Sequence, residues 1–432
     1  MNMILSKSKL SSTSEIQITG SKSETNRWLL LQALYPEIQI SNASNSHDSE
    51  VMEQVIRDFK LQTTLHHQPP TINHQPSTTN LSYNIHHAGT TMRFLTSFFA
   101  IQEGKEVLLT GSSRMKERPI AILVNALREL GADISYEEQE GFPPLRIRGK
   151  KITKNLVSLP ANVSSQYISA LLLIAPKLEN GLEITLQGET TSLPYIQMTL
   201  KMLQQIGVEV HFREQSIQIK PLKNLSEFSS NAIVESDWSS ASYWYSMVAL
   251  SEIGTKVQLS FFKENSLQGD AVLQDIYQKF GVETIFNSEE TITLTKTTSP
   301  HLSPFTFHLI NAPDIAQTIA VTCFGLGLAC ELTGLHTLKI KETDRLQALK
   351  NELGKLGAVV EITNDSLKLA NRQTPIKEAA INTYQDHRMA MAFAPLSLLS
   401  KIQINEAEVV EKSYPDFWKD LQKVGILQKE IS

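Results

Sequence analysis

The sequence repeats one pattern at a nearly fixed interval, and this restricts the fold more than any other feature. An amphipathic helix, a glycine and two alternating stretches separated by a polar turn recur around Gly131, Gly207, Gly281 and Gly357, at spacings of 76, 74 and 76 residues. Glycine directly past a helix is typical of a helix C-terminus, because glycine enters the left-handed region freely. The alternating stretches indicate a β-hairpin.

Two less distinct copies extend the pattern over the whole chain. VIRDFKLQTT (55–64) has the helix without the glycine, and DLQKVGILQ closes the chain around Gly425. Six repeats of about 72 residues account for the full length, so the period describes the architecture. The stretch 61–80 is the least regular, and we expect a loose polar hairpin there.

Each repeat also contains an earlier and more apolar helix with a polar start. These helices begin in the stretches SKSETNRW (21–28), AGTTMRFL (88–95), SSQYISAL (164–171), SDWSSASY (236–243), PDIAQTIA (313–320) and DHRMAMAF (386–393). Their small and apolar residues predict helices buried inside a repeat, whereas the amphipathic second helices should cover a surface. Strands are predicted between the two helices at 106–111, 182–188, 255–261, 336–340 and 401–405.

We therefore interpret one repeat as βαβαββ, which gives an α/β (α+β) fold class. A single repeat cannot bury its apolar faces alone, so the six should cluster, and clusters of three are expected.

Composition restricts the partners and the compartment. The chain of 432 residues is 41% apolar and 20% charged with a formal charge of −5, which favours neither nucleic acid nor an anionic membrane as a partner. Its apolar runs at 168–175 and 319–330 are too short to span a bilayer, and MNMILSKSKLSSTSE lacks a signal-peptide core. Two cysteines, Cys323 and Cys330, give no disulfide framework. We expect a cytoplasmic protein.

The unusual polar residues gather at helix starts. In TGSKSETNRWLL (19–30), Lys22 and Arg27 lie where the helix dipole disfavours cations, which suggests that an anion binds there. Related positions at first-helix starts hold Ser23, Gly89, Thr90, Arg93, Ser164, Ser165, Gln166, Asp314, His387 and Arg388, and those at second-helix starts hold Arg118, Ser192, Tyr195, Lys341, Glu342, Arg345 and Lys412. If these helix starts converge, their N–H groups and guanidinium groups form a site for phosphate and carboxylate.

Plainer interpretations exist for single residues. A lone basic loop residue is usually surface decoration, Glu342 and Arg345 could form an i,i+3 helix pair, and Ser164 and Ser165 could be caps. Recurrence at equivalent positions of the repeat favours the binding site.

Nine motifs make the chain resemble the 5-enolpyruvylshikimate-3-phosphate synthase (EPSP synthase) family. In order they are GSKSETNR, AGTTMR, RMKERPI, VSSQY, SLPY, PDIAQTIA, KETDRL, DHRMAMA and EKSYPDF, between about residues 16 and 420. The resemblance implies a two-domain inside-out barrel with three βαβαββ repeats in each domain. It implies one domain from 1–20 plus 236–432 and another from 21–235, hinges near 20 and 236, and a site in a closing cleft.

The implied reaction joins shikimate 3-phosphate and phosphoenolpyruvate and releases phosphate through a tetrahedral ketal. Carried over by motif, shikimate 3-phosphate would be held by Lys22, Ser23, Arg27, Ser164, Ser165, Gln166, Ser192, Tyr195, Asp314 and Lys341. Phosphoenolpyruvate would be held by Lys22, Gly89, Thr90, Arg118, Gln166, Arg345, Arg388 and Lys412. No metal and no organic cofactor is needed, and a monomer is expected.

Acid–base chemistry needs a group at the 5-hydroxyl and a group at the methylene carbon. Asp314 is expected to act as the base toward the hydroxyl, and Glu342 with Lys22 to handle protons at carbon, since cations around both carboxylates keep them ionised. The arginines would stabilise the developing negative charge.

The chain departs from the family pattern at several positions. His87 replaces a usual asparagine, Phe94 replaces a common proline, and Thr91 and Thr337 also differ, which leaves pocket dimensions and glyphosate sensitivity open. The histidines 66, 67, 74, 86 and 87 invite a metal site, but their spacing fits no tight ligand set.

Three other functions compete with this one. Enolpyruvyl transfer to a UDP-sugar uses the same architecture, but the loop SSRMKERP (112–119) lacks the cysteine or aspartate usual there. An RNA-end-processing protein would need a basic and aromatic stripe that the sequence does not have. A degenerate, non-catalytic paralogue stays open because of His87 and Thr337.

Overall fold

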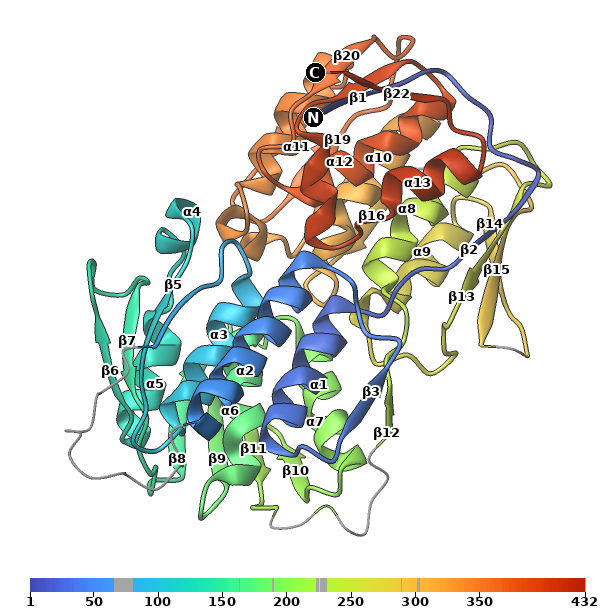
Figure 1. The fold of residues 1–432 in the computed structure, drawn as a ribbon. Coiled ribbons are helices and arrows are strands. Elements are labelled where there is room, and N and C mark those ends of the chain that lie inside the picture. The colour runs from blue at the N-terminus through green and yellow to red at the C-terminus, as the bar shows by residue number, and fades with distance from the viewer. Residues whose placement is uncertain are drawn as a thin grey trace. The chain divides into compact units, whose positions relative to one another are not determined.

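The chain folds as two compact units (Figure 1). The computed structural model describes residues 1–65, 81–162, 164–188, 190–222, 225, 231–288, 290–300 and 304–431. Unit 1 comprises Met1–Ser21, Ser44–Ser46 and Glu235–Ser432, and unit 2 comprises Lys22–Ala43 and His47–Val234.

Unit 2 is built from residues that are nearly contiguous in sequence. Its helices are α1 (Lys22–Leu34), α2 (His47–Leu65), α3 (Gly89–Ala100), α4 (Ser113–Lys116), α5 (Ala121–Leu130), α6 (Ser165–Ile174), η1 (Ala175–Lys177) and α7 (Leu193–Gln205). Its strands are β3 (Gln39–Ser41), β4 (Leu81–Asn84), β5 (Glu106–Thr110), β6 (Asp133–Tyr136), β7 (Leu145–Arg148), β8 (Leu156–Pro160), β9 (Leu182–Gln187), β10 (Val210–Arg213), β11 (Ser216–Ile219) and β12 (Asn231–Ile233).

Unit 1 combines the two ends of the chain. Its helices are α8 (Trp238–Ala249), η2 (Gly269–Val272), α9 (Leu273–Gln278), η3 (Pro313–Ile315), α10 (Ala316–Leu326), η4 (His336–Ile340), α11 (Arg345–Lys355), α12 (His387–Phe393), η5 (Ala394–Leu398), η6 (Ala407–Lys412) and α13 (Phe417–Lys423). Its strands are β1 (Asn2–Leu5), β2 (Thr13–Ile16), β13 (Lys256–Ser260), β14 (Val282–Phe286), β15 (Thr291–Lys296), β16 (Phe305–His308), β17 (Cys330–Thr333), β18 (Val360–Ile362), β19 (Leu367–Leu369), β20 (Ala379–Ile381), β21 (Ile402–Ile404) and β22 (Gln428–Ile431).

The four-stranded sheets of the described residues share one topology, which confirms the βαβαββ repeat. Their strand orders are β4-β5-β7-β6, β8-β9-β11-β10, β2-β13-β15-β14, β16-β17-β19-β18 and β20-β21-β1-β22. In each sheet the first pair is parallel and the other two pairs are antiparallel. A crossover helix is what a parallel pair requires.

Two sheets of unit 1 include a strand from the N-terminal segment of the chain. β1 lies between β21 and β22, with Met3 opposite both Ile404 and Glu430. β2 runs parallel to β13, with Thr13 opposite Lys256. Meanwhile β12, which precedes α8 in sequence, pairs with β3 in unit 2. The chain therefore closes unit 1 with residues from both of its ends.

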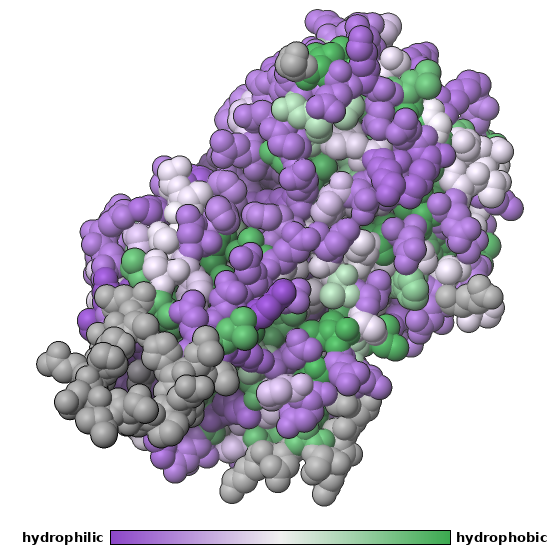
Figure 2. All heavy atoms as spheres, in the orientation of Figure 1, coloured by the Kyte–Doolittle hydropathy of each residue, from purple (hydrophilic) through white to green (hydrophobic). Residues whose placement is uncertain are grey.

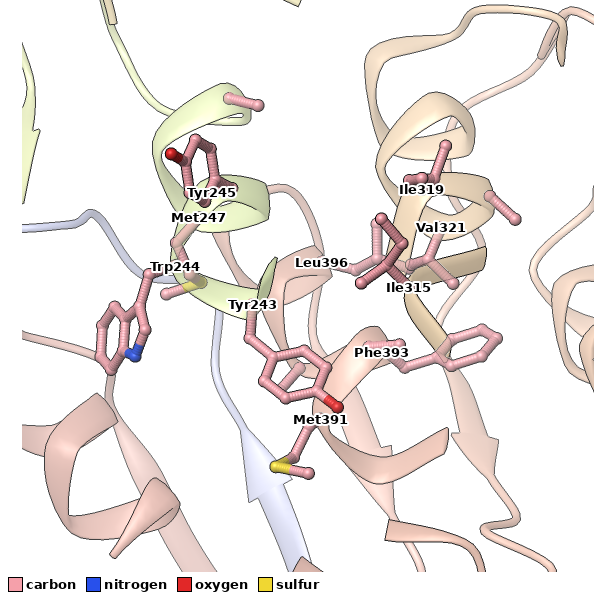
Figure 3. Close-up of a cluster of buried hydrophobic side chains, with 14 of the residues drawn as sticks. Tyr243, Trp244, Tyr245, Met247, Ile315, Ile319, Val321, Met391, Phe393 and Leu396 are labelled. Atoms are coloured by element: carbon pink, nitrogen blue, oxygen red, sulfur yellow. The ribbon is translucent and has the colours of Figure 1, made fainter. Parts of the chain in front are cut away.

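The first helices of the repeats form the interior of each unit. In unit 1, α8, α10 and α12 contact one another, and their apolar side chains meet in one cluster (Figure 3). Tyr243 and Met247 come from α8, Ile319 from α10, and Met391 and Phe393 from α12. In unit 2, α1, α3 and α6 contact one another in the same way. Helices inside and sheets outside confirm the inside-out barrel.

The face of the molecule shown in Figure 2 is mostly polar. Hydrophilic residues cover most of the face visible in Figure 2, and apolar residues appear on it as separate small groups. Within the described parts of the chain, no helix combines the length and the apolar character that crossing a membrane would require.

Two local predictions were wrong. Residues 336–340 form the 3₁₀ helix η4 rather than a strand, and the strand of this repeat is β17. Leu335 and Leu338 are both fully buried, and their spacing of three suits a 3₁₀ turn better than the alternation assumed from HTLKI. Residues 61–65 end helix α2 rather than begin a hairpin, and 66–80 lie outside the described residues.

The repeat glycines have the backbone conformation that their position requires. Gly131, Gly207, Gly281, Gly357 and Gly425 all have positive φ, between 79° and 112°. This confirms that each ends its helix through the left-handed region. At Gly281 space is also missing, since an added Cβ would lie 2.0 Å from the carbonyl oxygen of Thr298.

Replacing Gly281 with alanine should therefore destabilise unit 1 more than left-handed strain alone would. We expect Gly281→Ala to lower the free energy of unfolding by about 3 kcal/mol, because backbone must move. The matched control is Gly254→Ala, with φ of +97° and nothing within 4 Å, which should cost about 1 kcal/mol. Urea unfolding measures both, and equal losses would contradict the close approach.

Candidate active site

Three buried helices of unit 1 begin at the same place. Asp314 lies in η3 at the start of α10, Arg388 is the second residue of α12, and Ser239 is the second residue of α8. Arg388 Nη2 lies 3.3 Å from Asp314 Oδ2 and donates to Ser239 Oγ at 3.3 Å. Arg388 Nη1 also donates to the Asp314 carbonyl at 3.2 Å. The predicted convergence of helix starts is thus present within this unit.

Arg345 is the centre of the cluster. Its Nε donates to Asp386 Oδ2 at 2.6 Å, its Nη1 to Asp314 Oδ1 at 2.9 Å and its Nη2 to Glu342 Oε2 at 2.8 Å. The Arg345 side chain is 2% exposed and that of Asp386 is 0% exposed. One guanidinium therefore fixes three carboxylates from three different segments, a use that suits its rigid fork of donors.

Two lysines complete the cluster. Lys341 Nζ lies 3.5 Å from Asp314 Oδ1, and Lys412 Nζ lies 3.1 Å from Glu342 Oε1. Burial would raise the pKa of Asp314, but the charges of Arg388, Lys341 and Arg345 outweigh it and hold that pKa well below its usual range. Burial lowers the pKa of Lys341, against the pull of Asp314.

Unit 2 holds a second group of predicted site residues around Arg27. Arg27 is 2% exposed, and its Nε donates to Thr199 Oγ1 at 2.7 Å, its Nη1 to the Ser23 carbonyl at 2.7 Å and its Nη2 to Ser169 Oγ at 3.0 Å. Its guanidinium also lies 6.0 Å from the Tyr195 ring centroid. Burial lowers the pKa of Arg27 to about 10. Arg27 is therefore held rigidly by α1, α6 and α7.

A second arginine of unit 2 lies against a helix start. A Cβ added to Gly89, the first residue of α3, would lie 2.5 Å from Arg118 Nη1. Glycine thus leaves room for this guanidinium. Arg118 is 8% exposed, and its Nε has no hydrogen-bond partner among the described residues. A buried donor without a partner is costly, and a ligand, an ion or a water molecule would satisfy this one.

The remaining residues of this group follow the same helix starts. Gln166 donates to Thr90 Oγ1 at 3.1 Å, which joins the starts of α6 and α3. Lys22 Nζ lies 3.3 Å from Asp48 Oδ2, at the starts of α1 and α2. Ser164 caps α6, Ser165 is its first residue, and Ser192, with φ of 55°, precedes α7. Ser164 therefore has the cap function considered for it from sequence.

The structure separates the predicted residues into two groups. Asp314, Lys341, Glu342, Arg345, Arg388 and Lys412 form the cluster of unit 1, and Lys22, Ser23, Arg27, Gly89, Thr90, Arg118, Ser164, Ser165, Gln166, Ser192 and Tyr195 belong to unit 2.

Three carboxylates that contact predicted site residues or their neighbours were not themselves predicted from the sequence. Asp386 caps α12 and binds Arg345, Asp48 pairs with Lys22, and Asp270 accepts a hydrogen bond from Ser239. The first two had a signal, because aspartate is a common N-cap, as Asp386 is for α12, and is favoured in the first turn of a helix, as Asp48 is in α2. Asp270 lies at the start of the second helix of its repeat, the position where other repeats gave candidate residues.

Nothing in the described residues supports a metal centre. No group of three or more histidine, cysteine, aspartate or glutamate side chains with suitable placement occurs there. His86 lies 5.7 Å from His47 between ring centroids, and His87 Nδ1 contacts Ser112 Oγ at 2.8 Å. Cys323 and Cys330 are buried thiols. His66, His67 and His74 lie outside the described residues.

Comparison with known proteins gives one consistent result. A family model described as EPSP synthase (3-phosphoshikimate 1-carboxyvinyltransferase) matches residues 7–421. A curated relative from Bacteroides fragilis named 3-phosphoshikimate 1-carboxyvinyltransferase is 42% identical over 416 residues, 95% of each chain. One of the same name from Haemophilus influenzae is 37% identical over 428 residues, 95% of this chain and 96% of the relative.

A solved structure shows the same fold. EPSP synthase from Acinetobacter baumannii superposes with a TM-score of 0.74 at 21% identity, and the match covers 99% of both chains.

Removing the Arg345 charge should destabilise unit 1 in a pH-dependent way. Arg345→Met leaves Asp314, Glu342 and Asp386 buried with less compensation, so we expect a loss of about 3–5 kcal/mol at pH 8. The loss should shrink toward pH 5, because unpaired carboxylates there can take up protons. Chemical unfolding at both pH values measures it.

The control is Lys9→Met, which breaks an ion pair with Glu252 whose side chains are 83% and 79% exposed. This variant should unfold like the parent protein. If Arg345→Met lowered the free energy of unfolding equally at both pH values, the loss would not come from uncompensated charge on these carboxylates.

Proposed function

Because the chain belongs to the EPSP synthase family, we propose that it transfers the enolpyruvyl group of phosphoenolpyruvate to the 5-hydroxyl of shikimate 3-phosphate and releases phosphate. One observation carries this proposal: side chains from four family motifs, PDIAQTIA, KETDRL, DHRMAMA and EKSYPDF, gather around Arg345. Both substrates carry a phosphate and a carboxylate, and these anions suit a site rich in arginine and lysine.

The residues divide by substrate as the family motifs suggest. Shikimate 3-phosphate is held by Lys22, Ser23, Arg27, Ser164, Ser165, Gln166, Ser192, Tyr195, Asp314 and Lys341. Phosphoenolpyruvate is held by Lys22, Gly89, Thr90, Arg118, Gln166, Arg345, Arg388 and Lys412. The unpartnered Nε of Arg118 and its position against Gly89 support the second set.

The cations of unit 1 bind anions by exchanging partners. Arg345 and Arg388 each pair with Asp314, so a phosphate or carboxylate that arrives competes with this carboxylate for them. As the cations turn toward the substrate, Asp314 loses compensation and its pKa rises from its depressed value. Substrate binding thereby makes Asp314 a stronger base.

Asp314 then takes the proton of the 5-hydroxyl, which attacks the central carbon of phosphoenolpyruvate. The methylene carbon gains a proton to give the ketal, and the later loss of a methyl proton expels phosphate. Glu342, with Lys22, handles the protons at carbon. Its carboxylate is 12% exposed and lies between Arg345 and Lys412, which fixes its orientation while water is largely excluded.

The arginines stabilise the negative charge that develops on the departing phosphate. This chemistry needs no metal and no organic cofactor. The chain works as a monomer in the cytoplasm and binds neither nucleic acid nor membrane, and its two buried thiols suit a reducing compartment. The chain forms two domains, 1–20 plus 236–432 and 21–235. It passes from one domain to the other near residues 20 and 236, and these two segments serve as hinges.

Turnover with both substrates tests the function. Phosphate release should require shikimate 3-phosphate together with phosphoenolpyruvate, and Asp314→Asn and Glu342→Gln should each lower kcat by about 10²–10⁴-fold. Glu331→Gln, an exposed glutamate of β17, is the matched control and should keep the parent rate. No release by the parent protein would leave a non-catalytic paralogue, and release with a UDP-sugar instead would identify the other transferase.

Arg118 should act on one substrate. Arg118→Met should raise KM for phosphoenolpyruvate by about 10–100-fold, since a charged hydrogen bond contributes about 1.5–3 kcal/mol, while KM for shikimate 3-phosphate changes little. Arg114→Met, an arginine of α4 with a 38% exposed side chain, is the control. Equal increases of both KM values would remove Arg118 from the phosphoenolpyruvate set.

A further inference from the structure

Asp270 is a buried carboxylate close to Arg388, and it has no part in the mechanism proposed above. Asp270 is 2% exposed and sits in η2, at the start of α9. Its Oδ2 accepts a hydrogen bond from Ser239 Oγ. Its Oδ1 is buried and has no hydrogen-bond partner among the described residues. Asp270 is thus the least supported carboxylate of the cluster.

Ser239 connects this carboxylate to the cluster. The same Oγ that donates to Asp270 accepts from Arg388 Nη2 at 3.3 Å. Arg388 in turn contacts Asp314 at 3.3 Å. A chain of three contacts therefore runs from Asp270 to the residue that we propose as the base.

The charges that face Asp270 come from three other elements. Asp237 precedes α8, Asp314 precedes α10, and Arg388 lies on α12. Asp237 is supported by the backbone N–H and the hydroxyl of Ser240, at 3.0 and 2.8 Å. Tyr243 of α8 also faces Arg388, and burial keeps its phenol protonated by raising its pKa.

We propose that Asp270 is a positioning residue that takes up a proton when an anionic substrate binds at Arg388, acting through the Ser239 hydroxyl. This rests on the function proposed above, in which Arg388 holds phosphoenolpyruvate. A bound anion adds negative charge beside three carboxylates. The pKa of Asp314 starts well below its usual range, so Asp314 stays ionised even as its cations turn toward the anion, and Asp237 keeps its cap hydrogen bonds. The proton from solvent therefore goes to Asp270, whose carboxylate becomes a neutral carboxylic acid.

Protonation also reorients the hydroxyl. While Asp270 is ionised, the Ser239 O–H must donate to it. Once protonated, Asp270 can donate to Ser239 Oγ, and the Ser239 O–H can turn toward the bound anion. Burial, with the charge of Asp314 adding to it, raises the pKa of Asp270 to about 7, so this change falls in the neutral range.

The direction of the effect follows from linkage. If anion binding favours protonated Asp270, the anion binds more tightly below pH 7 than above it. An upward pKa shift of one unit on binding corresponds to a tenfold limit in affinity. The KM for phosphoenolpyruvate of the parent protein should therefore rise by about five- to tenfold more between pH 6 and 8.5 than that of a variant that cannot ionise here.

The experiment compares pH profiles of KM for phosphoenolpyruvate, at saturating shikimate 3-phosphate, in the parent protein, Asp270→Asn and Asp275→Asn. The amide introduced by Asp270→Asn mimics the neutral acid, so this variant should keep the low-pH KM throughout. Asp275 is exposed on α9, the helix that follows η2, so its variant should follow the parent profile. Ionisation of phosphoenolpyruvate itself affects all three proteins equally.

Calorimetry with phosphoenolpyruvate at pH 7, in buffers of different ionisation enthalpy, gives a second measurement. The parent protein should take up about 0.4 proton more than Asp270→Asn for a shift of one unit. Ser239→Ala provides a second test of the proposal in case Asp270→Asn does not fold. It removes the hydrogen bond that favours the carboxylate, so Asp270 stays protonated and KM stays flat between pH 6 and 8.

The outcomes separate the two proposals. A parent protein that releases no phosphate from the two substrates overturns the function. Turnover in which the parent and Asp270→Asn share one KM profile and one proton uptake overturns the assignment of Asp270 alone.

Discussion

The site of unit 1 depends on one guanidinium that holds three carboxylates. Arg345 reaches Asp314, Glu342 and Asp386 at 2.6–2.9 Å while its side chain is 2% exposed. Burying so many charges is favourable only if they are paired with good geometry. This pairing fixes the start of α11 against the starts of α10 and α12. The convergence of helix starts follows from electrostatics as much as from packing.

The same pairing explains how a site crowded with cations can exist in a protein of negative net charge. Each lysine or arginine of the cluster has a carboxylate partner, which in the proposed mechanism it leaves for a substrate anion. The carboxylates hold the cations in place, and the cations in turn hold the pKa of Asp314 well below its usual range. In the proposed mechanism, substrate binding and proton transfer are therefore coupled through these shared partners.

The periodic part of the sequence predicted the periodic part of the fold. Gly131 and Gly357 marked helix ends because a positive φ is a local requirement that glycine meets. The positions of Asp314, Glu342 and Arg388 at helix starts could be inferred from the same repeat. The i,i+3 pair of Glu342 with Arg345, considered from the sequence, is also present in the structure. The pairing of Arg345 with Asp386 could not be inferred, since these residues are 41 positions apart and only the tertiary fold makes them neighbours.

Prediction from local sequence patterns failed where tertiary contacts determine the structure or the role of a residue. HTLKI alternates like a strand, yet burial of Leu335 and Leu338 gives a 3₁₀ turn. Asp270 gave no signal of its own, because a single aspartate before a short helix is ordinary. Its significance comes from Ser239, which lies 31 residues away and also touches Arg388.

The placement of β1 between β21 and β22 has a consequence for biosynthesis. β1 pairs with β22, with Asn2 opposite Ile431, so this sheet cannot close until β22 has been synthesised. Unit 2 is almost contiguous and can fold while the rest is being made. Contacts of such long range slow folding, and the edges of β1, which stay unpaired until β21 and β22 have been made, are where a chaperone would be most useful during synthesis.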